Sequence, residues 1–543
     1  MPLKLLLALA LTTPFWDLGH PLWEVDDARY AEVPREMVAR GSWLTPTLND
    51  CDYVEKPPLI YWLPAASYRL FGVSEAAARL PNALLALLGL LGIWWLGAWL
   101  FTPATGMWAA VVLATTSEYF MLGRLLTPDM TVSVFLLWAA GLALRCLHRP
   151  EDARWASPLA WLAMALAFLS KGLIALLFPG LWTAALLVLF PELRRGLKGL
   201  LLSWGPAVFL VIVGGWFAAM ELRHPGFFHF FVIEQHFQRF LTPRYARPGP
   251  WYYFIGVDAA GTLPWTPLLL AASLLPLLRW RSQTPERRQL ALWVALVFAF
   301  FSVSKSKLPT YILPLFAFQA LLGAERIARG EPDFGTRWYR RPALALSALI
   351  LAAACAAPFL APRFLKTPLP PIVVPLAAAA AALLAIGLGA SALTRRGGEG
   401  ESPRPLGALL TPVLACAAFA LMLAGARPLA PQLSARDLAA ELSMRLRPGD
   451  RLFVYDKYLH GLPFYLGRRV DVVVNWLGEL HYAKRDPRFA DRFGDDNTIR
   501  AVKKGERVFV VLPKKTLQAF RALRPPNDPP TFTTVGDYLI AEL

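Results

Sequence analysis

The sequence predicts a polytopic α-helical membrane protein of about 13 transmembrane helices with a soluble α/β domain at its C-terminal end. Three observations predict this fold class. Hydrophobic residues make up 56% of the 543 residues, charged residues make up only 17%, and apolar segments recur along the first four fifths of the chain. Soluble domains usually carry about 25% charged residues. The composition therefore excludes an ordinary soluble enzyme, a disordered chain and a coiled coil.

Each expected span is an apolar segment long enough, or nearly long enough, to cross a bilayer, which takes about 20 residues. The first segment, from Leu3 to Trp16, is short, and it also fits the apolar core of a signal peptide. The segments begin near Leu3, Pro81, Gly106, Met130, Trp155, Gly172, Gly199, Tyr252, Leu290, Leu308, Ala343, Pro371 and Leu406.

The net charge of +17 is concentrated in alternate short loops, which is the pattern of cytoplasmic loops in membrane proteins. We therefore attribute it to membrane orientation rather than to a nucleic-acid partner. The loops of the other set, at residues 17–80 and 221–251, face outward with the C-terminal tail. The expected domains are residues 1–430, which form the membrane domain carrying these loops with interfacial helices, and residues 431–543, which form the outer α/β domain.

The tail has the pattern of alternating helices and buried strands. Residues 434–446 and 514–523 read as helices, whereas RLFVYD, RVDVVV and RVFVVL, starting at Arg451, Arg469 and Arg507, read as buried strands. This alternation predicts a small α/β domain.

Charged residues of the membrane domain cluster near the outer ends of the expected spans, whereas the middles of the spans are almost free of charge. Ionisable residues within a membrane are costly and mark functional sites, and transporters place them near the midplane. The distribution therefore favours a site at the outer membrane–water boundary. The residues concerned are Glu118, Arg124, Asp129, Lys171, Asp258, Lys305 and Lys307.

Two motifs of the first outer loop carry candidate chemistry. The adjacent carboxylates of Asp26 and Asp27 suit a base or an orienting group, although a helix N-cap with a local arginine partner fits them too. In Tyr53-Val54-Glu55-Lys56-Pro57-Pro58, the prolines hold Lys56 extended. A fixed ammonium is a phosphate ligand; the alternative is a Lys56–Glu55 pair beside lipid headgroups.

Further candidates lie in later outer segments. Lys305 and Lys307, which precede Tyr311, are outward lysines that need an anionic partner, either a substrate or a lipid headgroup. Three histidines, His224, His229 and His236, fall in the second outer loop. A helix would place the last two on one face, where they could bind zinc with a carboxylate such as Glu55. The preferred candidate pair is His236 with Glu55, in a structural role, because both fall in outer loops that should converge on one site; polar packing is the alternative.

The order of these motifs resembles a known group. An outward Asp26-Asp27 pair, the EKPP turn, Arg124 to Asp129, Lys171-Gly172, HFxRF ending at Phe240, and KxKLPxYxLP from Lys305 follow one another along the whole chain. The sequence is similar to the GT-C membrane glycosyltransferases of the protein mannosyltransferase-like superfamily, and within it to the lipid A 4-amino-4-deoxy-L-arabinose transferases.

The resemblance implies a glycosyltransferase that moves the aminosugar from undecaprenyl phosphate to a lipid A phosphate at the periplasmic face of the bacterial inner membrane, a lipopolysaccharide modification that confers polymyxin resistance. It implies that Asp26 is the key carboxylate and that Asp129 is a second acidic position. Lys56 would contact the donor phosphate, and Arg239, Tyr311 and Tyr53 would line the donor site. The chemistry would require no cofactor.

Two alternatives remain at this point. The first is a related transferase that moves a hexose or mannose from a polyprenyl phosphate to protein or glycan. The second is a lipid or polysaccharide transporter, against which the sparse midplane charge argues.

Overall fold

The computed structural model describes residues 2–238, 248–330, 339–364, 369–392, 406–476, 478–481, 483–503, 505–524 and 529–543. The chain divides into two compact units. The first unit comprises Met1–Asp17 and Leu80–Ala426, and the second comprises Leu18–Arg79 and Arg427–Leu543. The domain boundaries expected from the sequence remain a proposal.

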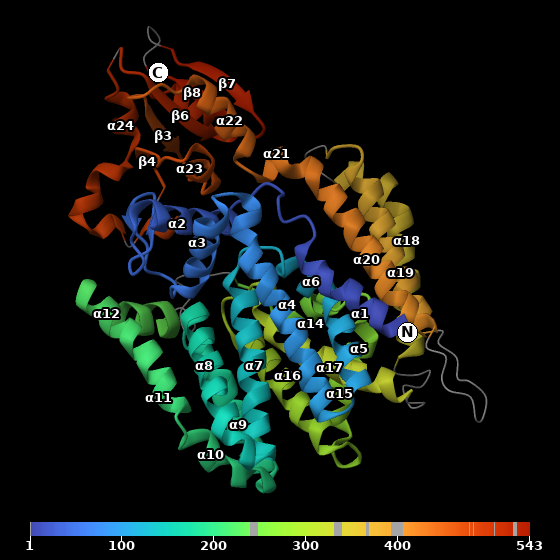
Figure 1. Cartoon of the computed structure of the whole chain (residues 1–543). Helices are drawn as coiled ribbons and strands as arrows, with labels where there is room; N and C mark the ends of the chain where they lie inside the picture. Colours follow the sequence, from blue (N-terminus) through green and yellow to red (C-terminus); the bar gives the residue numbers. More distant parts are fainter. Residues whose placement is uncertain are drawn as a thin grey trace. The chain divides into compact units, whose positions relative to one another are not determined.

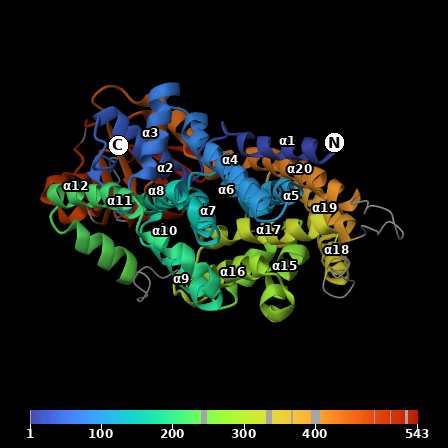
Figure 2. The same ribbon diagram turned by 60° about the horizontal axis from the view of Figure 1, so that its bottom comes forward.

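The first unit is built from helices (Figures 1 and 2), and each apolar segment expected from the sequence falls on one or more of them. Its described α-helices are α1 Pro2–Thr12, α4 Glu75–Leu100 (which begins in the second unit), α5 Pro103–Ala114, α6 Ser117–Leu122, α7 Pro128–His148, α8 Ala153–Lys171, α9 Ile174–Leu189, α10 Leu197–Leu201, α11 Gly205–Phe209, α12 Gly215–Arg223, α14 Tyr253–Gly261, α15 Thr266–Leu278, α16 Pro285–Val303, α17 Leu313–Arg329, α18 Arg340–Phe364, α19 Val373–Ala392 and α20 Leu406–Ala426.

Seven helical segments of the described chain are long and apolar enough to cross a membrane, and four shorter helices are also apolar. The protein is therefore a multi-pass integral membrane protein, while the number of spans stays a prediction. A π-helix, η5 His229–Gln238, lies in the second outer loop where the sequence predicts an interfacial helix.

Small residues and hydroxyl groups join the last three helices of this unit, α18, α19 and α20, which lie side by side in Figures 1 and 2. The Ser347 hydroxyl donates to the Ala385 carbonyl, and the Thr411 hydroxyl donates to the Gly387 carbonyl, both at 2.7 Å. Such contacts are typical of helices that associate within a membrane.

Arg124, one of the charged residues near an outer span end, has a packing role. It is buried, and its guanidinium donates to the carbonyls of Thr13 and Trp16 at 2.7 Å while lying 3.6 Å from the ring centre of Phe120. Helix ends leave carbonyls without intrahelical partners, so Arg124 satisfies those at the end of the first apolar segment.

The second unit combines the first outer loop with the C-terminal tail. Its six-stranded sheet has the order β5-β4-β3-β6-β8-β7, in which β5, β4, β3 and β6 run parallel and β8 and β7 add antiparallel strands. Its elements are α2 Asp26–Arg40, β1 Thr47–Leu48, β2 Cys51–Asp52, α3 Leu59–Phe71, α21 Ala430–Leu433, α22 Arg436–Arg445, β3 Arg451–Tyr455, α23 Gly461–Leu466, β4 Val472–Val474, β5 Phe493–Gly494, α24 Asp496–Arg500, β6 Val508–Pro513, α25 Leu517–Arg521, β7 Thr531–Val535 and β8 Tyr538–Glu542.

The three strands expected from the sequence are present as β3, β4 and β6, and their apolar side chains form the core of the sheet with Phe520 of α25. The final antiparallel pair, β7 and β8, was not expected. The residues of β7 are only partly buried, so the sequence lacks the continuous apolar run that marked the other strands.

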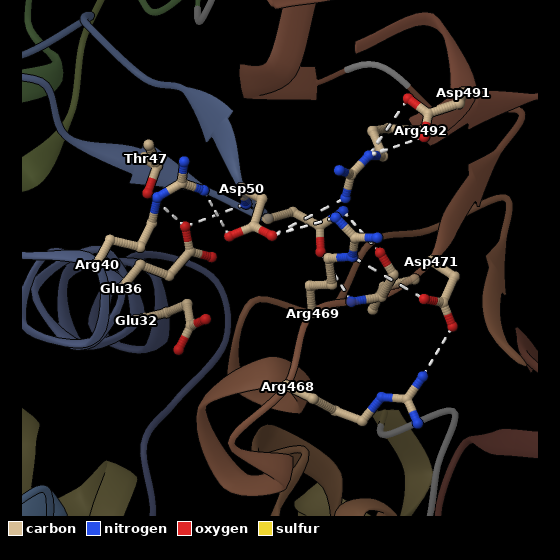
Figure 3. Close-up of polar contacts among 12 residues, drawn as sticks. Glu32, Glu36, Arg40, Thr47, Asp50, Arg468, Arg469, Asp471, Asp491 and Arg492 are labelled. Atoms are coloured by element: carbon tan, nitrogen blue, oxygen red, sulfur yellow. Dashed lines mark hydrogen bonds and ion pairs between the residues drawn. The ribbon is translucent and has the colours of Figure 1, made fainter. Parts of the chain in front are cut away.

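Hydrogen bonds fix the first outer loop to the tail within this unit. The side chain of Asn49 exchanges two hydrogen bonds with the backbone of Val470, at 2.8 and 3.1 Å. Asp50 pairs with Arg40 of α2 at 2.8 Å and with Arg469 of the tail at 3.2 Å (Figure 3). Glu36 accepts from the Thr47 hydroxyl at 2.6 Å. The loop is thus a folded part of the second unit rather than a mere connector.

Candidate active site

Asp26 and Asp27 begin helix α2 but have different surroundings. The N-cap position is Val25, which makes no side-chain capping hydrogen bond, so neither carboxylate is the N-cap of the alternative interpretation. The local arginine partner of that interpretation is present, because Asp26 pairs with Arg29. The Asp26 side chain is 50% exposed, whereas that of Asp27 is only 5% exposed. The two carboxylates therefore face different environments.

Asp27 is part of the structural framework. It pairs with the guanidinium of Arg79, and it also accepts from the Trp23 backbone N–H at 3.1 Å. Arg79 donates in addition to the carbonyls of Leu18 and His20, at 2.8 and 2.5 Å. This buried cluster fixes the segment that leads into α2.

Asp26 pairs with Arg29, one turn further along α2, and leaves half of its own surface open. The other arm of the guanidinium, Nη1, donates to Glu479 Oε1 at 2.6 Å, and the guanidinium carbon lies 5.1 Å from the ring centre of Tyr30. Glu479 is thus part of the site, although nothing in the sequence pointed to it. It lies 450 positions from Arg29, and only the folding of the tail onto the first loop brings them together.

The Tyr53–Pro58 turn lies against the same helix through stacked aromatic rings. Tyr61 stacks on Tyr30 at 6.0 Å and meets Tyr53 edge-on at 6.3 Å between ring centres. Burial raises the pKa of the Tyr53 phenol above its usual range, and the positive charge of Arg29 only partly opposes this effect. The Tyr53 phenol therefore stays neutral. Glu55 and Lys56 are half-buried.

In the first unit, the candidates Asp129 and Tyr311 meet at Lys171. Asp129 is in the first turn of α7, and its carboxylate binds the ammonium of Lys171, the last residue of α8. The same ammonium lies 4.3 Å from the ring centre of Tyr311, a cation–π contact. Lys171 was named among the outer charges, and the structure adds that it joins the two site candidates.

The two lysines near Tyr311 differ from each other. Lys305 is exposed, whereas Lys307 is buried. The Lys307 ammonium donates to the backbone carbonyls of Ser302 and Phe301 at 2.7 and 3.3 Å, which lie at the C-terminal end of α16, where a cation is stabilised. A role for either lysine in substrate binding stays a prediction.

Two candidate residues fall outside what the structure describes. Arg239 is in the undescribed segment, and the side chain of His236 is likewise not described. Among the described residues, no group of three or more His, Cys, Asp or Glu side chains is placed to hold a metal ion. The zinc pair Glu55–His236, like the expectation that no cofactor is required, stays a prediction.

Comparisons with known proteins agree with this architecture. Residues 55–217 match the family model described as dolichyl-phosphate-mannose-protein mannosyltransferase. Undecaprenyl phosphate-alpha-4-amino-4-deoxy-L-arabinose arabinosyl transferase of Pectobacterium carotovorum is 34% identical over 334 residues, and that match covers 59% of this chain and 58% of the relative. An enzyme with the same description from Aeromonas hydrophila is 34% identical over 320 residues, with 56% of each protein covered. The matched region is thus less than two thirds of the length of these relatives.

The structural match extends over the whole chain. The crystal structure of ArnT from Cupriavidus metallidurans bound to undecaprenyl phosphate superposes with a TM-score of 0.85 and 25% identity, over 99% of this chain and 97% of that one. The archaeal oligosaccharyltransferase AglB from Archaeoglobus fulgidus shares the fold at a TM-score of 0.51 and 13% identity, over 96% of this chain and 70% of that one. Together, these matches show that the chain has an ArnT-like GT-C fold and is similar to known membrane glycosyltransferases.

Proposed function

We propose that this protein transfers 4-amino-4-deoxy-L-arabinose from undecaprenyl phosphate to a phosphate group of lipid A. The observation that carries the proposal is the structural likeness, along nearly the whole chain, to an ArnT that binds undecaprenyl phosphate. Relatives named as undecaprenyl phosphate-aminoarabinose arabinosyl transferases support the same sugar donor.

The donor half of the reaction requires cations. As the glycosidic bond to the lipid phosphate breaks, negative charge accumulates on the departing phosphate, and fixed positive groups stabilise it best where water is partly excluded. We assign this role to Lys56, which precedes two prolines and is half-buried, and to Arg239. Lys305 and Lys307 are secondary candidates for binding the substrate.

The acceptor half decides what Asp26 does. A phosphate monoester has a second pKa of about 6 and is largely ionised at neutral pH, so it needs no general base. Asp26, half exposed and paired with Arg29, would then orient the acceptor or the ammonium of the aminosugar. Asp129 is the second carboxylate of the proposal, and Tyr53 and Tyr311 supply aromatic surface to the sugar or the donor lipid.

The location follows from loop charge. Basic residues concentrate in alternate short loops, so we place these loops in the cytoplasm of a bacterial inner membrane. The long loops and the C-terminal domain then face the periplasm, where lipid A is modified.

Two other functions are tested by the same experiment. A related transferase would attach a different polyprenyl-linked sugar, and a lipid or polysaccharide transporter would move its substrate unchanged. Mass spectrometry of lipid A from cells with and without this protein should show an added aminopentose only when it is present. Unmodified lipid A in both strains, despite a supply of donor, would contradict the proposal.

A further inference from the structure

His460 is a buried histidine with a carboxylate on each side. It precedes helix α23 and is 1% exposed. Its Nδ1 lies 3.6 Å from Glu24 Oε2, and its Nε2 lies 3.6 Å from Glu479 Oε2. The rings of Tyr458 and Trp476 meet the imidazole edge-on, with centres 5.0 and 6.0 Å away.

This surrounding suits an imidazolium. A neutral imidazole has only one N–H, whereas the charged form has one on each nitrogen and can face both carboxylates. Burial opposes the charge, but Glu24 and Glu479 outweigh it and raise the pKa of His460 above its usual value. Burial likewise disfavours the charged form of Glu479, but His460 and Arg29 hold its pKa at about 2.

The other groups around His460 do not offset the rise in its pKa. Burial raises the pKa of the Tyr458 phenol well above its usual value, so it adds no charge. Glu24 is fixed because it also accepts from the backbone N–H groups of His460 and Gly461 at 2.9 and 2.6 Å. Besides His460, Arg29 is the cation that an ion pair joins to Glu479 among the described residues, and it lies on the opposite carboxylate oxygen.

A continuous row of alternating charges therefore leads from the interior of the second unit to Asp26, the proposed catalytic carboxylate. Glu24 faces His460, His460 faces Glu479, Glu479 accepts from Arg29 at 2.6 Å, and Arg29 pairs with Asp26. Only the final member, Asp26, is half exposed.

We propose that His460 is a positioning residue of the transfer reaction, which holds Glu479 against Arg29 and thereby fixes the orientation of Asp26. This role rests on the proposed function. It predicts that the protonation of one buried histidine governs activity. When pH rises through the pKa of His460, the imidazolium loses its charge, and Glu479 loses one of its two cationic partners. The hydrogen bonds of the Arg29 guanidinium are then divided differently between Glu479 and Asp26.

The test is the pH profile of the purified full-length protein with undecaprenyl-phosphate aminoarabinose and lipid A. In wild-type protein, kcat should fall at alkaline pH. In His460→Gln, kcat at neutral pH should be lower by about 3- to 30-fold, the donor KM should stay within about twofold, and the alkaline fall should vanish. His481→Gln is the matched control, because it changes an exposed histidine in the same short helix as Glu479; its profile should match wild type.

A second variant covers the case in which His460→Gln does not fold. Glu24→Gln keeps an oxygen acceptor for one of the two backbone N–H groups and removes one carboxylate from His460, so the alkaline limb should move to lower pH. A purely structural role for His460 would lower the yield of folded protein without moving that limb.

The outcomes separate this proposal from the proposed function. Active wild-type protein whose alkaline limb is unchanged in both variants would overturn the role of His460 alone. Wild-type protein that transfers no aminoarabinose would overturn the proposed function, and the positioning role with it.

Discussion

The guanidinium of Arg79 lies buried against the carboxylate of Asp27, although the two residues are 52 positions apart in the chain. Removing one partner of a buried ion pair leaves the other charge uncompensated, so Asp27 has a structural role. Its neighbour Asp26, with half of its side chain exposed, remains available to a substrate.

The first prediction contrasts these two carboxylates. Asp26→Asn should abolish transfer and leave thermal unfolding nearly unchanged, because it removes the charge of a half-exposed group. Asp27→Asn should lower the free energy of unfolding by about 3 kcal/mol, while the protein that remains folded still transfers the sugar. Each variant is the control for the other, measured by transfer assays and thermal unfolding in detergent. Near-normal transfer by folded Asp26→Asn would remove Asp26 from the mechanism and make Asp129 the leading carboxylate.

The second prediction concerns the donor phosphate. Lys56→Ala and Arg239→Ala should each reduce kcat/KM for the polyprenyl-phosphate donor by about ten- to a hundredfold, since a lost charge-assisted contact costs about 1.5–3 kcal/mol. Lys515→Ala, which alters an exposed lysine of the second unit, should leave the rate unchanged. Full activity of both site variants at limiting donor would mean that other residues bind the phosphate.

Whether the sequence could predict a feature depends on how far apart in the chain the interacting residues lie. The strands β3, β4 and β6 were predicted because continuous apolar runs are a local signal. The candidate motifs around Asp26 and Tyr53 were also local, and the aromatic rings of Tyr30 and Tyr61 bring them together. By contrast, Glu479 reaches Arg29 across 450 positions, and no periodicity encodes that contact.

Lys307 shows a second kind of limit. An outward lysine suggests an anionic ligand, and the structure adds that its ammonium also donates to backbone carbonyls at the end of α16, which the sequence did not indicate. The sequence identifies charges that need partners, whereas only the fold tells whether the backbone already supplies them.

The third prediction tests the Asp129–Lys171 pair, in which Lys171 also contacts the Tyr311 ring. Asp129→Asn and Lys171→Met should each reduce transfer, and the double variant should lose much less than the product of the two single effects, because each change already breaks the same pair. Lys514→Ala with Lys515→Ala, which change two exposed lysines of the second unit, provides the additive reference. Full additivity in the Asp129–Lys171 cycle would show that the two residues act independently.

The fourth prediction concerns orientation. Of the four cysteines, Cys355 is exposed and Cys51, Cys146 and Cys416 are buried. In a Cys355→Ser background, a cysteine introduced by Lys514→Cys should react with an impermeant maleimide added outside intact spheroplasts, because the C-terminal domain is proposed to face the periplasm. Labelling of this position only after the membrane is opened would reverse the proposed topology.

The last prediction concerns acid stability and Glu479. Burial disfavours its charge, but His460 and Arg29 hold the pKa of this carboxyl at about 2 in the folded protein, against about 4.3 in an unfolded chain. Because the folded pKa is the lower one, the stabilisation by Glu479 is complete above about pH 4.3 and is lost as pH falls towards about 2.

Glu479→Gln should therefore lower the free energy of unfolding at neutral pH by about 1.5–3 kcal/mol, and this deficit should shrink between about pH 4.3 and 2. Glu506→Gln, which alters an exposed carboxylate of the same unit, should show neither effect. Unfolding followed by intrinsic fluorescence across this pH range measures both quantities, and a deficit in Glu479→Gln that stays constant down to the acid end would show that the ionised carboxylate does not stabilise the fold through His460 and Arg29.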